Sequence, residues 1–473
     1  MAPLLTGSLQ AVLPGWVAQQ RWYVGKGRVP ALREIAVLAL TDPSAAVEIT
    51  VHLLLDESGG APTIYQVPLT CRTGRLTGAD HALVSIEPPA AGERDQPGAE
   101  VTRYYYDGPH DPAFATALLT LMVAEQQVGM ATGHRLTTAD PGDVSASHVL
   151  VGEQSNTSIV LDLVDSLGTA MKPLICKLFR VLQNGENPDV IVQSALSAGG
   201  STRVPASVGY VCGHWPDATT TGGVASGHLA FAQEFLPGVQ DAWRVALAAV
   251  GADADFTEAA RSLGQATAQV HATLARTMGT REATPHDIAA LTASMRARHA
   301  AALCEVPALA DYDTMIATSI QAVSSARWPA MQRIHGDYHL GQVLDVPGRG
   351  WVLVDFEGEP MRPLTERTQP DLALRDVAGM LRSFDYVAGS WEQGHPGQSA
   401  ARWASRARTA FLAGYTASAG RDPRDDAPLL DALELDKILY EVVYEARNRP
   451  TWLAIPITAI ARLSAGPRSD LLT

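Results

Sequence analysis

The feature that most constrains the fold of this chain is a change of hydrophobic pattern near residue 238. Before it, short stretches such as AVEITVHLLL and TSIVLDLV are rich in apolar and β-branched residues, which predicts strands of antiparallel sheets. After it, the pattern is mostly that of amphipathic helices, interrupted by the β-rich passage MQRIHGDYHLGQVLDVPGRGWVLVDFEGEP. Because 473 residues are too many for one ordinary core, we expect an α+β chain of several packed units.

We predict three such units. Residues 1–105 form a β-rich cap domain, with strands in AVEITVHLLL and PTIYQVPLTC. Residues 106–236 form a lobe with a linking helix over PAFATALLTLMVAEQQ, a sheet, and a second helix over NPDVIVQSALSAGG. The strands of that sheet are expected in SHVLVGE, TSIVLDLV, KPLICKLFR and GHLAFAQEFL. Residues 237–473 form a helical lobe that carries a β-hairpin.

Composition excludes several classes of function. Hydrophobic residues make up 46% of the chain and charged residues 18%, as in globular proteins. With a net charge of -14 and no basic run, nucleic acid is not an expected partner. The four cysteines show no Cys-x-x-Cys spacing, so neither a disulfide framework nor a zinc site is expected. The N-terminus lacks a signal pattern and no segment has eighteen consecutive apolar residues, so we expect a cytoplasmic protein without a membrane partner.

The β-rich passage carries the residues that phosphoryl transfer from ATP requires. Such chemistry needs a carboxylate that accepts the alcohol proton and oxygen ligands for Mg²⁺. Asp337 stands where the catalytic base of a kinase stands, Gln342 follows five residues later as a metal-binding amide, and Asp355 ends an apolar strand as the main metal ligand. Glu357 adds a further carboxylate. Either aspartate alone would be read as a turn residue, but their joint spacing favours catalysis with ATP and Mg²⁺ as cofactors.

Three upstream segments are candidates for binding the nucleotide. Lys177, among apolar residues of a predicted strand, is expected to bind the α- and β-phosphates, although an edge-strand lysine would look similar. The turn that begins at Gly152 places small donors where a phosphate-covering loop belongs, and a plain polar hairpin is the alternative. These donors are Ser155, Asn156, Thr157 and Ser158. We expect the connection to the helical half to form the adenine hinge, although any link between two domains would look similar. Its residues are Gln233, Glu234, Phe235 and Leu236.

At these residues the chain resembles the actinobacterial maltokinases and glucosamine kinases. The resemblance covers nearly the whole length, through QRWYVGKGR, GEQSNTS, KLFR, HGDYHLGQVL, DFEGEP, RDVAGMLRSFDY and YEARNRPTWLAIP. It implies a bilobal, protein-kinase-like fold of the aminoglycoside phosphotransferase type with a cap domain, and ATP with Mg²⁺. Maltokinases usually have leucine where this chain has Tyr338, which favours the glucosamine branch. Ile191 stands where a glutamate partner of Lys177 is expected, which leaves Asp189 as the nearest carboxylate.

The resemblance also implies an acceptor site near the C-terminus. On a helix, Tyr440 and Tyr444 share one face, as do Glu441 and Glu445, and Trp452 lies beyond Pro450. Spacing alone is equally typical of a core helix with a charged outer face, whereas the resemblance favours a sugar pocket. Its expected lining residues are Asp337, His339, Glu441, Tyr444, Glu445, Arg447 and Trp452. By contrast, Arg375, Asp376, Arg382 and Asp385 are interpreted as internal ion pairs of a structural helix.

Four functions remain open at the level of sequence. The leading acceptor is glucosamine, phosphorylated on its 6-hydroxyl, followed by maltose, phosphorylated on its anomeric hydroxyl. An aminoglycoside is a third acceptor, although such enzymes lack this cap. A pseudokinase that only binds its ligands is the alternative from another class, and the presence of Lys177, Asp337, Gln342 and Asp355 argues against it.

Overall fold

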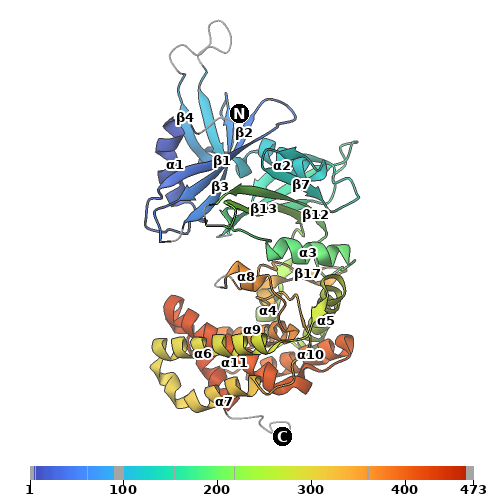
Figure 1. The fold of residues 1–473 in the computed structure, drawn as a ribbon. Helices are drawn as coiled ribbons and strands as arrows, with labels where there is room; N and C mark the ends of the chain where they lie inside the picture. The colour runs from blue at the N-terminus through green and yellow to red at the C-terminus, as the bar shows by residue number, and fades with distance from the viewer. Residues whose placement is uncertain are drawn as a thin grey trace. The chain divides into compact units, whose positions relative to one another are not determined.

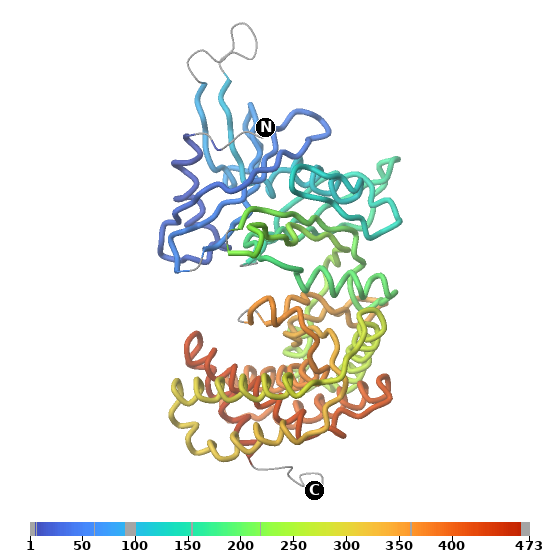
Figure 2. Tube along the Cα trace, in the orientation of Figure 1, coloured from blue at the N-terminus to red at the C-terminus, as the bar shows by residue number. Residues whose placement is uncertain are grey.

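The chain divides into two units, which are described separately. The first comprises Met1–Ser194 and Ala206–Pro237, and the second comprises Ala195–Pro205 and Gly238–Thr473. The computed structural model describes residues 5, 7–60, 62–89, 101–152, 155–217, 219–359 and 362–464. Figures 1 and 2 show the course of the chain.

The first unit begins with an antiparallel sheet in the order β1-β2-β3-β5-β4. A helix, α1 (Gly7–Gln19), packs on this sheet through Leu9, Leu13 and Val17, which share an apolar core with strand residues. The strands expected in AVEITVHLLL and PTIYQVPLTC are confirmed as β2 and β3. The strand bounds are β1 (Leu32–Leu40), β2 (Glu48–Asp56), β3 (Thr63–Arg72), β4 (Leu83–Glu87) and β5 (Arg103–Asp107).

A second sheet of the same unit has seven antiparallel strands in the order β6-β7-β12-β13-β10-β9-β8. Its helices are α2 (Pro112–Val123) and α3 (Pro188–Ala198), at the two places where the sequence predicts them. The four predicted strands are confirmed as β8, β9, β10 and β13. The strand bounds are β6 (Gln127–Val128), β7 (Ala131–Arg135), β8 (Asp143–Val149), β9 (Asn156–Val164), β10 (Leu174–Phe179), β12 (Ser207–Pro216) and β13 (Val224–Glu234).

The two sheets of this unit are joined by the pairing of two strands and by a common apolar core. Directly after β10, the short strand β11 (Val181–Leu182) pairs with β3 of the first sheet. The side chain of Gln66 on β3 is buried and donates to the carbonyl oxygens of Phe179 and Leu229, at 3.1 and 3.0 Å. Apolar residues of β1, β2, α2 and the seven-stranded sheet form one cluster. The predicted boundary at residue 105 falls inside β5, and the three-part division stays a proposal.

The second unit is mainly helical, as the pattern after residue 238 predicts. Among its helices, α6 and α11 lie side by side, and α11 also packs against α9 (Figures 1 and 2). Within the described ranges, no helix is both long and apolar enough to cross a lipid bilayer. The helix bounds are α4 (Ala242–Gly251), α5 (Thr257–Met278), α6 (Pro285–Glu305), α7 (Asp313–Val323), α8 (Leu364–Arg367), α9 (Ala373–Gly394), α10 (Ala401–Ala419), α11 (Ala427–Asn448) and α12 (Ala454–Ser464).

The predicted hairpin of the β-rich passage is present in this unit. Its strands β17 (Val343–Val346) and β18 (Gly350–Leu353) pair with each other, and β14 (Gln240–Asp241) pairs with β17. A separate two-stranded sheet consists of β15 (Thr280–Arg281) and β16 (Met331–Gln332). The loop from β16 to β17 therefore contains the HGDYH motif, and the segment after β18 contains Asp355 and Glu357.

Candidate active site

The loop that carries Asp337 is fixed to helix α9 by backbone hydrogen bonds. The buried carboxylate of Asp376 accepts hydrogen bonds from the backbone N–H groups of His335 and Gly336, at 2.8 and 2.9 Å. It also lies 3.0 Å from Nε2 of His271. Gly379 lies so close to the loop that a Cβ atom there would stand 2.5 Å from the carbonyl oxygen of Tyr338. The sequence predicts Asp376 as part of an ion pair within its helix, whereas its contacts are with this loop and with His271 of α5.

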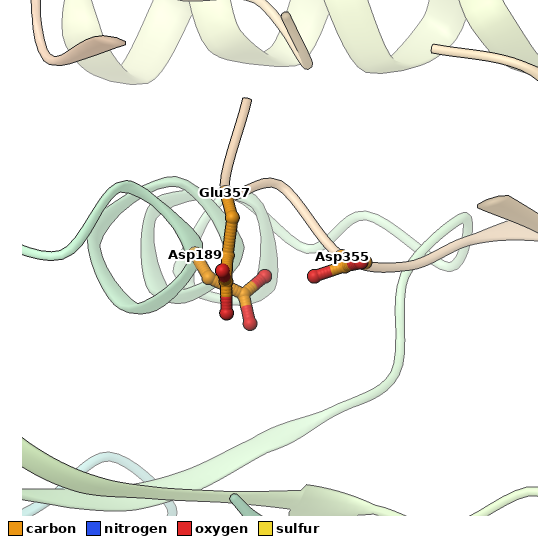
Figure 3. A group of neighbouring side chains, drawn as sticks. All are labelled: Asp189, Asp355 and Glu357. Carbon is orange, nitrogen blue, oxygen red and sulfur yellow. The ribbon is translucent and has the colours of Figure 1, made fainter. Parts of the chain in front are cut away.

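Behind the loop, Gln342 and Asp355 form a group of oxygen donors with Glu357. The amide nitrogen Nε2 of Gln342 donates to Oδ2 of Asp355 at 3.1 Å. Asp355 has a φ of 66°, a conformation that costs energy for residues other than glycine and is common at functional sites. Carboxylate oxygens of Asp355 and Glu357 lie within 4.8 Å of each other on the segment after β18 (Figure 3). Carboxylate and amide oxygens are suitable ligands for Mg²⁺, so this donor set fits that ion.

In the first unit, Lys177 on β10 is paired with a carboxylate of α3. Its Nζ lies 2.9 Å from Oδ2 of Asp189, which is fully buried in the first turn of the helix. Gln193, one helical turn later, donates to the other oxygen of Asp189 at 2.6 Å. The ion pair with Asp189 is therefore present although Ile191 occupies the position where a glutamate was expected.

The predicted phosphate-covering turn connects β8 and β9. Asn156, Thr157 and Ser158 are the first residues of β9, and Ser155 is exposed just before it. Thr157 and Ser158 are buried, and the hydroxyl of Thr157 accepts a hydrogen bond from Nε of Arg180 at 2.8 Å. Thr157 is thus engaged within the sheet, whereas Ser155 belongs to the turn itself. Glu153 and Gln154, in the middle of this turn, lie outside the described residues.

The predicted adenine hinge begins at the end of β13. Gln233 and Glu234 are the last residues of that strand. The backbone N–H of Glu234 donates to the carbonyl of Ala206 at 2.8 Å, and that of Phe235 donates to Pro173 at 3.0 Å. The backbone N–H groups of Glu234 and Phe235 are therefore already hydrogen-bonded within the first unit. A nucleotide base would need other backbone groups of this segment, such as those of Leu236.

The second unit contains a cavity of about 570 Å³ beside Asp337. This volume is in the usual range for small-ligand sites. Residues from α4, the segment between β16 and β17, α9, α11 and the segment after α11 line it, namely Trp243, Asp337, His339, Gly341, Gly379, Ser383, Tyr386, Lys437, Tyr440, Glu441, Tyr444, Glu445, Arg449 and Trp452. Six of the seven residues expected at an acceptor site therefore lie around one cavity.

Two buried glutamates of α11 face arginines at this cavity. Glu441 accepts hydrogen bonds from Nε and Nη2 of Arg382, at 3.2 and 2.9 Å. Burial raises the pKa of Glu441 above its ordinary value, and the opposing charge of Arg382 does not cancel this effect. Glu445 accepts from Arg449 at 2.9 and 2.6 Å and from the hydroxyl of Tyr386 at 3.3 Å.

The seventh expected lining residue, Arg447, lies elsewhere. It donates through Nε to Glu305 of α6 at 2.7 Å, and its side chain is largely exposed. Arg449 takes its place in the cavity, with its guanidinium carbon 4.6 Å from the ring centroid of Trp452. A helix of 3.6 residues per turn separates positions two apart by about 200°, so the two arginines leave the helix end on different sides. Sequence reasoning missed Arg449 and Lys437.

Tyr338 and the polar residues of α9 have structural surroundings. The ring of Tyr338 is 2% exposed, and its hydroxyl lies 2.8 Å from that of Thr267 on α5. It is not among the described residues that line the cavity. Arg382 and Asp385 form the expected ion pair within α9 at 2.8 Å, but Arg382 also binds Glu441 at the cavity wall.

Sequence comparisons connect both parts of the chain to known families. Residues 16–111 match the maltokinase N-terminal cap domain, and residues 190–429, about half of the chain, match the phosphotransferase enzyme family. The chain is 30% identical over 289 residues to a glucosamine kinase of Streptacidiphilus jiangxiensis, a match that spans 57% of this chain and 64% of that protein. It is 32% identical over 308 residues to a glucosamine kinase of Mycolicibacterium smegmatis, covering 60% of this chain and 73% of that protein.

Solved structures of glucosamine kinases have a similar overall fold. A glucosamine kinase in complex with glucosamine, ADP and inorganic phosphate superposes with a TM-score of 0.69 at 24% identity, covering 98% of this chain and 100% of the other. A glucosamine kinase in crystal form A superposes with a TM-score of 0.68 at 24% identity, covering 98% of this chain and 99% of the other. At this identity the likeness defines the fold, which is kinase-like with a β-rich N-terminal region. The chain therefore belongs to the phosphotransferase enzyme family and carries a maltokinase-type N-terminal cap domain.

Proposed function

We propose that this chain is an ATP-dependent sugar kinase that transfers a phosphoryl group to the 6-hydroxyl of D-glucosamine. The observation that carries the proposal is the cavity beside Asp337, which combines a candidate base with two buried glutamates and the half-buried Trp452. Its two family relatives named above are glucosamine kinases, and each matches this chain over more than half its length. A site of this composition suits a small, polar, cationic acceptor.

In the proposed reaction, Asp337 accepts the proton of the acceptor hydroxyl. The hydroxyl oxygen then forms a bond to the γ-phosphorus, while the bond between that phosphorus and the β,γ-bridging oxygen breaks and ADP leaves. Asp337 is suited to this role because it lies at the cavity wall on a loop held rigid by Asp376. The remaining residues of the site bind and orient the two substrates.

We propose nucleotide-binding residues in the first unit and metal-binding residues in the second, each described within its own unit. Lys177, fixed by Asp189, is the proposed ligand of the α- and β-phosphates, and Ser155 and Asn156 would cover them. Gln342, Asp355 and Glu357 are the proposed ligands of Mg²⁺. When bound, Mg²⁺ supplies positive charge that offsets the negative charge of the transferred group.

The amino group of glucosamine is the feature that the cavity is proposed to select. It is a cation at neutral pH, and a charge-assisted hydrogen bond to a carboxylate contributes about 1.5–3 kcal/mol. Glu441 and Glu445 are the candidate partners, and Trp452 offers a ring face for the sugar. Each glutamate already contacts an arginine, so recognition of the amine rests on the carboxylate oxygens that the arginines leave accessible.

Maltokinase activity is the second candidate, favoured by one observation. Residues 16–111 match a cap domain that is described from maltokinases. In that case the same base would act on the anomeric hydroxyl of maltose.

An ADP-release assay with glucosamine, N-acetylglucosamine, glucose, maltose and kanamycin separates these functions. We expect the highest kcat/KM for glucosamine, with ³¹P NMR locating the phosphate on the 6-oxygen. N-acetylglucosamine is the matched control, because it keeps the ring and removes the cation. A higher kcat/KM for maltose would replace the proposal by the maltokinase function. Binding of ATP without turnover of any acceptor would instead identify a binding module.

A further inference from the structure

Lys437 is a partly buried lysine whose ammonium group lies between two carboxylates. It projects from α11 into the cavity wall, where its Nζ is 3.1 Å from Oδ1 of Asp337 and 2.9 Å from Oε1 of Glu359. Its side chain is only 19% exposed, and Nζ lies 4.9 Å from the ring centroid of Tyr440. Lysines are rarely buried unless they are paired, and this one is paired twice.

The charge of Lys437 is stabilised in this position. Burial disfavours the ammonium form, but the negative charges of Glu359 and Asp337 outweigh burial and raise the pKa of Lys437 above its ordinary value. The lysine is therefore a cation at neutral pH. Because Glu359 is a second counter-ion, the ammonium keeps a partner when Asp337 becomes neutral by accepting a proton.

Glu359 connects this lysine to a wider set of ion pairs. It accepts a hydrogen bond from Nε of Arg362 at 3.0 Å, and Nη1 of Arg362 lies 3.5 Å from Asp371. Asp371 in turn binds Nε of Arg375 at 2.7 Å. Lys437 thus joins the loop of Asp337 to a network anchored on α9.

We propose that Lys437 is a positioning residue that holds the carboxylate of Asp337 in its proton-accepting orientation. This inference rests on the proposed function, because it assigns a role relative to the acceptor hydroxyl. With Oδ1 of Asp337 held by the ammonium, Oδ2 is the oxygen that faces the acceptor. A fixed orientation matters because a misplacement of about 1 Å in a reacting group lowers rates by about a hundredfold.

The test is a double-mutant cycle on kcat with Lys437→Met and Asp337→Asn. Alone, Lys437→Met is expected to lower kcat by about tenfold to a hundredfold with little change in the KM for ATP. In the Asp337→Asn background, it should lower kcat by less than about threefold, because the group it positions is gone. Lys26→Met is the matched control, since Lys26 is an exposed lysine of the cap that contacts only backbone carbonyls of Gln20 and Arg21 in the described chain.

A pH profile separates positioning from a purely structural role. The charged or titratable groups near Asp337 include Lys437 and Tyr440 of α11 and Glu359, which shares the Lys437 ammonium. His339 and His335 of the same loop and Asp355 are further such groups. Removal of a cation from beside the proposed base is expected to move the acidic limb of kcat to higher pH. A structural role would lower Tm and leave this limb in place.

Multiplicative losses of kcat in the double variant, or an unchanged acidic limb, would overturn the role of Lys437. If Lys437→Met does not fold, Lys437→Gln provides the same readouts with a polar side chain of similar length. The cycle is run with whichever acceptor the wild-type chain turns over fastest. Failure to use glucosamine would then refute the proposed acceptor, while the coupling between Asp337 and Lys437 is decided independently.

Discussion

Nε2 of Gln342 lies 3.1 Å from Oδ2 of Asp355, although thirteen residues separate the two in the chain. The hairpin of β17 and β18 brings them together, since Gln342 precedes the first strand and Asp355 follows the second. An amide and a carboxylate at the open end of a hairpin are a suitable pair of oxygen donors for a divalent cation.

The first prediction concerns this pair. Asp355→Ala is expected to abolish phosphoryl transfer, because the proposed main ligand of Mg²⁺ is removed. Titration of Mg²⁺ against initial rate should show poor rescue even at high concentration, while Tm stays near that of the parent. An unchanged rate and unchanged Mg²⁺ dependence would exclude Asp355 as a metal ligand.

For Asp337, the expected effect is on rate rather than on folding. Asp337→Asn should lower kcat by roughly two to four orders of magnitude, the usual contribution of a general base. Asp345→Asn is the matched control, because Asp345 is an exposed aspartate of the neighbouring β17. Near-normal kcat in folded Asp337→Asn would remove this residue from the mechanism.

Replacement of Glu441 tests recognition of the amine. Glu441→Gln is expected to raise the KM for glucosamine by about tenfold to a hundredfold and to change that for glucose little, since only the amino sugar loses an ion pair. Glu305→Gln, an exposed residue that binds Arg447 away from the cavity, should leave both constants unchanged. Equal effects on the two sugars would indicate general damage instead.

The pKa of Glu441 also predicts how this selectivity depends on pH. A carboxyl group whose pKa is raised loses its charge at a higher pH than an ordinary glutamate does. As pH falls from neutral, the preference for glucosamine over glucose should therefore decline before ordinary carboxylates titrate. The ratio of the two kcat/KM values, measured against pH in wild type and in Glu441→Gln, checks this. A variant that keeps the same decline would show that another group causes it.

The buried ion pair of Asp107 and Arg180 in the first unit should be important for stability. Nη2 of Arg180 lies 2.8 and 2.6 Å from the two oxygens of Asp107, and both side chains are buried. Asp107→Ala leaves an uncompensated buried guanidinium and is expected to cost about 3–5 kcal/mol in the free energy of unfolding. Glu57→Ala, which breaks an exposed pair with Arg33, should cost less than about 1 kcal/mol. Chemical denaturation of both variants measures the difference, and similar costs would contradict it.

Much of the architecture could be predicted because its signals are local. Alternating strands, amphipathic helices and the HGDYH motif each occupy a short stretch, and the structure confirms the strands and helices. Lys437 was missed because it is 100 residues from Asp337, and a lysine in a helix has no distinctive local pattern. The available signal in the sequence was that Lys437 lies four residues before Glu441, and therefore on the same helix face. Arg447 was chosen over Arg449 because sequence does not reveal where a helix end turns.

Tyr338 illustrates a different limit. Its place in the HGDYH motif favours glucosamine in the sequence, yet its hydroxyl contacts Thr267 in the core. This packing gives the side chain a structural role that the motif alone does not reveal. The comparisons with glucosamine kinases, rather than this side chain, support the proposed acceptor.

The pairing of β11 with β3 has a consequence for anyone who wishes to shorten this chain. A fragment that begins after residue 111, where the cap-domain match ends, would lose β3, the partner of β11. It would also lose Asp107, the carboxylate that neutralises Arg180. It would also uncover the apolar faces of α2 and the seven-stranded sheet that β1 and β2 protect. The family match that starts at residue 190 is thus not the boundary of an autonomous enzyme, and expression trials should retain the chain from α1 onward.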